Sequence, residues 1–113
     1  MLNFDMVGRL DTNSMILRII RNDNYSEIDS LLFKVKPEKL NLRITSENKD
    51  FTDASAFYSL GISSLSFTTG SHDDYHKVSD TADKINYEEM EKILNFVETL
   101  LFNLQEHEKN GKK

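Results

Sequence analysis

A long helical repeat near the C-terminus constrains the fold of this chain most strongly. Seven apolar residues recur there at intervals of three or four positions, which is the spacing of one face of a helix. They are Met90, Ile93, Leu94, Val97, Leu100, Leu101 and Leu104. The preceding Asn86-x-x-Glu89 is typical of a capping box. A helix with one apolar face needs a second layer to cover that face, so we expect it to pack on other elements of the chain.

Four shorter runs upstream have the composition of strands. They are residues 1–5, 15–20, 40–45 and 62–67. Two helical segments alternate with them. One is capped by Ser26 and limited by Pro37, and the other spans residues 53–60 and is closed by Gly61. This alternation predicts an α/β fold, a layered sheet of about four strands flanked by helices.

Size and composition limit the fold to one domain and exclude several classes of function. The 113 residues suffice for one domain, which we expect over residues 1–108 with a disordered basic tail at 109–113. The net charge of −5 argues against nucleic acid as a partner, because phosphate binding needs a clustered basic surface. The absence of cysteine excludes disulfides and thiolate metal sites. No signal peptide is visible, and no apolar run approaches the ~18 residues of a membrane span.

The loop that precedes the long helix carries much titratable chemistry. Its sequence, SHDDYHKVSD at 71–80, combines two histidines, a tyrosine and three aspartates. On these residues alone, either a solvated loop or part of a metal site is possible, and the second reading requires further ligands elsewhere.

Three segments together resemble one known family. NFDMVGRL (3–10), TDASAFYSLGI (52–62) and FTTGSHDDYHKVSDTADKINYEEM (67–90) are similar to the C-terminal part of the co-catalytic dizinc aminopeptidases. These are the M28-type metallopeptidases, relatives of glutamate carboxypeptidase and glutaminyl cyclase. The resemblance implies the C-terminal part of a phosphorylase/hydrolase-like zinc peptidase fold, and peptides as substrates of the complete enzyme.

The resemblance also implies roles for individual residues. Asp5 matches a ligand of one zinc ion, and His76 matches a ligand of the second. Tyr75 matches a tyrosine that stabilises the oxyanion in some members. Asp80, four residues after His76, is suited to orienting the loop or its ligand from outside the metal. We expect Arg9 to form a structural ion pair. His72 corresponds to no ligand, and we expect it at the surface.

The family's remaining parts lie upstream of the segment that Asp5 begins. They are a histidine, a bridging aspartate and a glutamate as ligands, and a second glutamate as general base. We therefore expect this chain to form the C-terminal portion of a zinc-dependent aminopeptidase-like domain and to be inactive, or nearly so, by itself. Whether it binds zinc alone stays open. The alternative is a non-catalytic truncated homologue, a small interaction module or a homo-oligomer formed through an exposed sheet edge.

Overall fold

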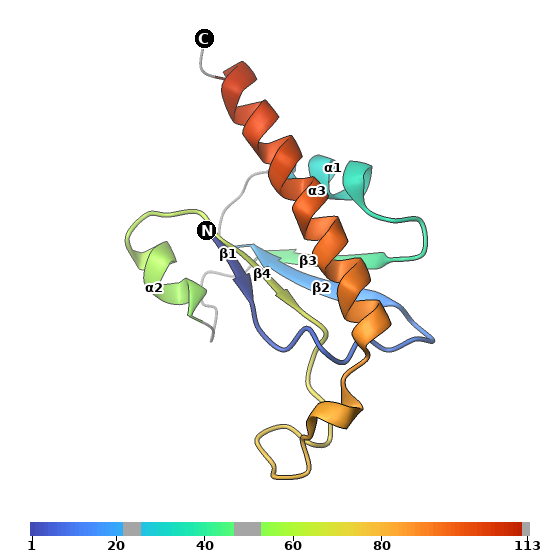
Figure 1. Ribbon diagram of the computed structural model, residues 1–113. Helices are drawn as coiled ribbons and strands as arrows, with labels where there is room; N and C mark the ends of the chain where they lie inside the picture. Colours follow the sequence, from blue (N-terminus) through green and yellow to red (C-terminus); the bar gives the residue numbers. More distant parts are fainter. Residues whose placement is uncertain (22–25, 47–52, 112–113) are drawn as a thin grey trace.

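The computed structural model describes residues 1–21, 26–46 and 53–111, with only the backbone for 26–27 and 107–111. Its centre is a four-stranded mixed sheet in the order β1-β4-β2-β3 (Figure 1). The strands are β1 (Leu2–Phe4), β2 (Ile16–Arg21), β3 (Asn41–Ser46) and β4 (Leu65–Thr68). β1 runs parallel to β4, and β2 runs parallel to β3. The two pairs meet where β2 and β4 lie antiparallel.

Three α-helices and one 3₁₀ turn complete the chain. They are α1 (Ser26–Val35), α2 (Ala54–Ser59), η1 (Ala82–Lys84) and α3 (Tyr87–Gly111). α3 crosses the sheet and contacts α1, while α2 lies to one side near β1 (Figure 1). None of the described helices is long and apolar enough to cross a membrane. The expected α/β sheet of four strands flanked by helices is confirmed.

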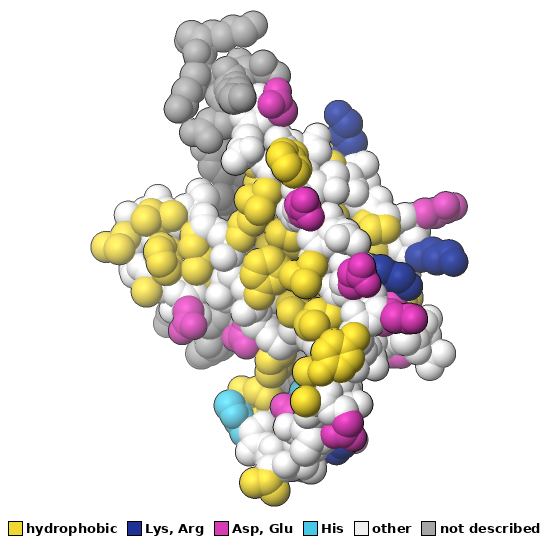
Figure 2. All heavy atoms as spheres, viewed as in Figure 1, with side chains coloured by type: hydrophobic (Ala, Val, Ile, Leu, Met, Phe, Trp, Pro, Cys, Tyr) yellow, Lys and Arg dark blue, Asp and Glu magenta, His cyan; other side chains and the backbone are white. Residues whose placement is uncertain are grey.

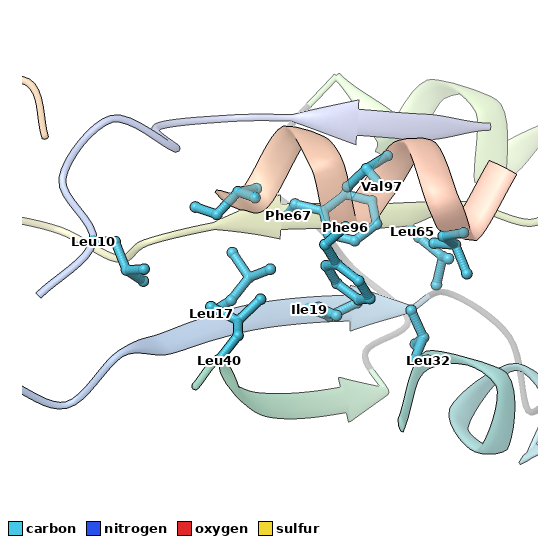
Figure 3. Packing of buried hydrophobic residues seen from close by; sticks show 11 residues of the cluster. Leu10, Leu17, Ile19, Leu32, Leu40, Leu65, Phe67, Phe96 and Val97 are labelled. Carbon is cyan, nitrogen blue, oxygen red and sulfur yellow. The ribbon is translucent and has the colours of Figure 1, made fainter. Parts of the chain in front are cut away.

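The core lies between one face of the sheet and the two helices α1 and α3 (Figure 3). Strand residues alternate across the sheet, so Leu17, Ile19 and Phe67 point into this layer and are fully buried. Leu32 of α1 and Phe96 of α3 meet them from the helix side. Burial of this apolar surface holds α3 onto β4, the strand that leads into the polar loop.

The predicted boundaries hold for most elements, and Gly61 ends the α2 segment with a positive φ of 78°, as expected. The fourth strand differs, because it begins at Leu65 and not at residue 62. The amide of Ile62 donates to Phe57 O at 3.0 Å, and the N-terminal amine donates to Ser63 O at 2.8 Å. Residues 62–64 therefore connect α2 to the sheet. The cap predicted at Ser26 concerns a side chain outside the described part.

The start of α3 also differs from the prediction. Asn86 precedes the helix, but neither reciprocal capping-box bond forms among the described residues. Its amide donates instead to Gly8 O at 2.8 Å, and its Nδ2 donates to Leu10 O at 2.7 Å. Glu89 pairs with Lys92 Nζ at 2.9 Å. Asn86 thus ties the start of α3 to the segment that follows β1, a long-range use that sequence spacing cannot reveal.

Candidate functional site

The polar residues singled out in the sequence follow two neighbouring parallel strands. β1 and β4 end side by side, and the chain leaves both at the same end of the sheet (Figure 1). The amide of Asp5 donates to Phe67 O at 3.1 Å, and the amide of Thr69 donates to Met6 O at 2.9 Å. The backbone that carries Asp5 is therefore fixed to the start of the loop after β4. Carboxyl ends of parallel strands are where α/β proteins usually bind ligands.

Asp5 and the Tyr75–His76 pair are all exposed at this end of the molecule. The Asp5 carboxylate and the His76 ring form no hydrogen bond with the described residues. The rings of Tyr75 and His76 lie against one another, with centroids 3.9 Å apart. His76 has a φ of 59°, a left-handed backbone that non-glycine residues adopt rarely. Figure 2 shows histidine side chains at the surface below α3, at this same end.

Arg9 joins the two segments. Its Nη1 donates to Asp74 Oδ2 at 2.8 Å, and its Nη2 donates to Asp80 Oδ1 at 2.6 Å. Asp74 also accepts bonds from Ser79 Oγ at 2.6 Å and from Lys84 Nζ at 3.0 Å. The structural ion pair expected for Arg9 is thus present and is part of a network. Asp80 contacts Arg9, and its orienting role toward a metal ligand stays a prediction.

The hydrogen bonds of this network and of the neighbouring Thr81 shift the pKa values of three groups. The bonds from the Ser79 hydroxyl, the Arg9 guanidinium and the Lys84 ammonium hold the pKa of the Asp74 carboxyl well below its usual range. The hydrogen bond to Asp74, aided by that to Asp80, raises the pKa of Arg9 above its ordinary value. A hydrogen bond from the Thr81 hydroxyl lowers the pKa of Asp83. The loop is therefore held by ionised groups at every pH near neutrality.

His72 is not the surface residue expected from the sequence. Its side chain is only 17% exposed and lines a pocket of about 320 Å³ with Met6, Arg9, Asp80 and Ile85. Its Nε2 lies 4.0 Å from Asp80 Oδ2, and its Nδ1 is buried without a hydrogen-bond partner. The loop folds back over the segment after β1, which covers this ring. The sequence held one hint of this covered position. Acidic residues surround His72, and Arg9 supplies the opposite charge that can draw the loop onto the segment after β1.

The residues at this end fit a zinc ion in type but not in number. A carboxylate and an imidazole are both common zinc ligands. Within the described part of the chain, however, no three His, Cys, Asp or Glu side chains come together as a metal-binding group. A catalytic zinc usually takes three protein ligands, so these residues do not complete a metal centre.

Comparison with known families decides what kind of domain this is. The family model described as peptidase family M28 matches residues 1–101, most of the chain. The chain belongs to peptidase family M28. The relationship expected from the three sequence segments is thereby confirmed, and the four-stranded sheet with its helices is consistent with the M28 peptidase fold. Comparisons with curated proteins and with solved structures gave no match.

Membership of the M28 family makes this a peptidase-like domain. The matched residues include both the strand end at Asp5 and the loop of Tyr75 and His76. Sequence reasoning missed the parts that join them, namely Asp74, Lys84 and the covered ring of His72. A usable signal was present, because the arginine of DMVGR and the acidic residues of HDDYHKVSD lie in the two segments that carry the resemblance.

Proposed function

We propose that this chain forms the C-terminal portion of a zinc-dependent aminopeptidase-like metallopeptidase domain. Asp5 and His76 would each supply one ligand, to different zinc ions. The phenol of Tyr75 would donate a hydrogen bond to the oxyanion that develops on a peptide substrate in the complete domain. Zinc would supply a nucleophilic hydroxide and polarise the scissile carbonyl.

One observation supports this proposal above the others. Asp5 and the loop of His76 follow adjacent parallel strands whose ends are hydrogen-bonded to one another. An M28 domain needs residues from both segments at one end of its sheet, and this connection keeps those segments together. Both side chains are exposed, as ligands shared with another part of a protein need to be.

The chain by itself should not hydrolyse peptides. The described residues contain no cluster of three metal ligands. A proton must also pass from the attacking water to the leaving amine, and this needs a general base close to the metal. Neither Asp74 nor Asp80 is suited to that task, because both are occupied by the Arg9 guanidinium.

A zinc titration of the purified chain tests the ligand assignment. We would follow the histidine ring resonances by NMR while adding zinc, in the wild type and in Asp5→Asn, His76→Gln and His72→Gln variants. We expect weak binding that shifts the His76 ring, is lost in His76→Gln and persists in His72→Gln. A zinc response at His72 with none at His76 would overturn the assignment. Aminopeptidase turnover by the wild-type chain alone would overturn the expected inactivity.

The alternative role as a self-associating module also has support. β1 is one of the two outer strands of the described sheet. Met1 and Asp5 make backbone hydrogen bonds to β4, so the intervening Leu2 and Phe4 direct their backbone groups away from it. Beside it, α3 exposes Leu94 and Leu101, and Figure 2 shows hydrophobic side chains in a band along this helix. An open strand edge next to an apolar helix stripe favours association with a second copy of the chain.

A further inference from the structure

Arg9 reaches both sides of the Tyr75–His76 pair. Asp74 immediately precedes the pair, Asp80 follows it by four residues, and the two carboxylates bind different nitrogens of one guanidinium. The Arg9 side chain is 19% exposed and the Asp74 side chain 18%, whereas the Asp80 side chain is 45% exposed, so the bond to Asp74 is the more shielded of the two. Hydrogen bonds between ionised groups are shorter and stronger than neutral ones, and a rigid planar fork fixes direction as well as distance.

Arg9 itself stands on a fixed backbone. Met6 O accepts bonds from both the amide and the hydroxyl of Thr69, the latter at 2.7 Å. Gly8 O and Leu10 O accept bonds from Asn86, and the Leu10 side chain is buried in the core. The segment that carries Arg9 is therefore held to β4 on one side and to the start of α3 on the other.

The loop needs such support. His76 has a left-handed backbone, which a histidine adopts only when its surroundings determine it. Local turn bonds contribute, since the amide of Lys77 donates to Asp74 O at 2.9 Å and that of Asp80 donates to Lys77 O at 3.1 Å. These bonds lie within the loop and cannot by themselves orient it toward Asp5. The ion pairs of Arg9 with Asp74 and Asp80 span 65 and 71 positions and connect the loop to the segment that follows Asp5. Lys84 ties Asp74 only to the neighbouring 3₁₀ turn η1.

We infer that Arg9 is a positioning residue of the peptidase site. Its guanidinium holds the loop of residues 72–80 through Asp74 and Asp80, so that Tyr75 and His76 are presented beside the segment of Asp5. The functional part of this inference rests on the proposed ligand roles of Asp5 and His76. The mechanical part, that Arg9 fixes the loop, stands on the contacts alone.

A comparison of arginine variants tests the mechanical part. Arg9→Met removes the charge and both bonds, and Arg9→Lys keeps the charge without the fork. Asp80→Asn weakens one branch and serves if Arg9→Met does not fold. Arg43→Met is the matched control, because Arg43 is an exposed arginine of β3 without an ion pair in the described part of the chain. Native-state hydrogen exchange and the Cα shift and amide coupling constant of His76 report on the loop.

We expect exchange of the Lys77 and Asp80 amides to rise about ten-fold in Arg9→Met, with β2 and β3 amides unchanged. The left-handed signature of His76 should move toward the unstructured average. Arg9→Lys should lie between Arg9→Met and the wild type, and Arg43→Met should match the wild type. Unchanged amide exchange in the loop of Arg9→Met, or an equal rise of exchange over the whole chain, would overturn the inference.

The zinc titration separates this inference from the proposed function. In Arg9→Met, zinc affinity measured at the His76 ring should fall roughly ten-fold, the effect typical of groups that orient a metal ligand. An unaltered zinc response in Arg9→Met would overturn the positioning role and leave the ligand assignment in place. If amide exchange in the loop rises in Arg9→Met but the His76 ring of the wild type does not respond to zinc, the ligand assignment is overturned and the mechanical role of Arg9 stands.

Discussion

The ring of Phe67 in β4 meets the ring of Phe96 in α3 edge to face, with centroids 6.5 Å apart and planes at 87°. Phe4 of β1 stacks on Phe67 with centroids 5.5 Å apart. One side chain thus links the long helix to both strands that lead into the functional segments. Aromatic pairs in such geometries contribute beyond their buried area. The same contacts that form the core therefore fix the framework of the site.

Replacing Phe67 by alanine should destabilise the domain severely. The side chain is fully buried, and loss of a buried phenylalanine typically costs about 3–5 kcal/mol in the free energy of unfolding. Urea unfolding followed by circular dichroism measures this loss. Phe33→Ala on α1 is the matched control, since Phe33 is 52% exposed and its removal should change the free energy by less than about 0.5 kcal/mol. Similar losses in both variants would contradict the core described here.

Two glycines should respond in opposite ways to the same substitution. Gly61 has a φ of 78°, so Gly61→Ala should destabilise the domain by about 1–2 kcal/mol although no atom lies near its added methyl group. At Gly8 the methyl group would meet Ile85 at an ordinary distance of 3.5 Å without such a φ, and Gly8→Ala should be neutral or slightly stabilising. Thermal unfolding of the two variants checks this order, which equal losses would contradict.

Asp74 should make the domain sensitive to acid. Its pKa is lower in the folded than in the unfolded chain, so the unfolded chain binds more protons at acid pH. The resulting stability is fully present above the unfolded value of about 4 and is lost as the pH falls below it. We expect Asp74→Asn to flatten the fall in urea midpoint between about pH 5 and pH 2.

Two further variants sharpen this pH test. The lowered pKa of Asp83, caused by the Thr81 hydroxyl, acts in the same direction, so Asp74→Asn should leave part of the acid dependence in place. Asp73→Asn is the control, because Asp73 is exposed and makes no hydrogen bond in the described part of the chain. An acid dependence that survives intact in Asp74→Asn would show that the Arg9 network does not govern acid stability.

The sequence predicted the order of the elements well because hydrophobic periodicity is a local property. α3, the α2 stop at Gly61 and the positions of Asp5 and the His76 loop all follow from short stretches of residues. The pairings of Arg9 with Asp74 and Asp80 span 65 and 71 positions, and no local pattern specifies which partner a charge selects. The partial burial of His72, whose side chain is 17% exposed, was missed as well, because it depends on how the loop packs on the segment after β1.

The helical spacing of α3 also predicted more buried positions than the structure has. Leu94 and Leu101 belong to the apolar repeat, yet both are about half exposed. Residues seven apart lie almost above one another on a helix, and this pair lies beside the face that Ile93, Phe96 and Leu100 bury. Periodicity identifies an apolar stripe, but the width that a single sheet can cover depends on tertiary packing. The uncovered part is the surface that we propose for self-association.

Self-association through this surface gives the last prediction. We expect the wild-type chain to form dimers at high concentration in sedimentation velocity, because pairing buries the Leu94 and Leu101 stripe together with the open edge of β1. Leu94→Glu combined with Leu101→Glu should shift the equilibrium toward monomer. Both substitutions place a carboxylate where pairing would bury an apolar side chain, and Glu91 and Glu98 lie on the solvent side of the stripe, so they could not compensate the added charge. Phe33→Glu, an equally exposed position on α1, should leave the dimer intact. A wild type that stays monomeric at all concentrations, or dimers lost equally in Phe33→Glu, would contradict an interface at this surface.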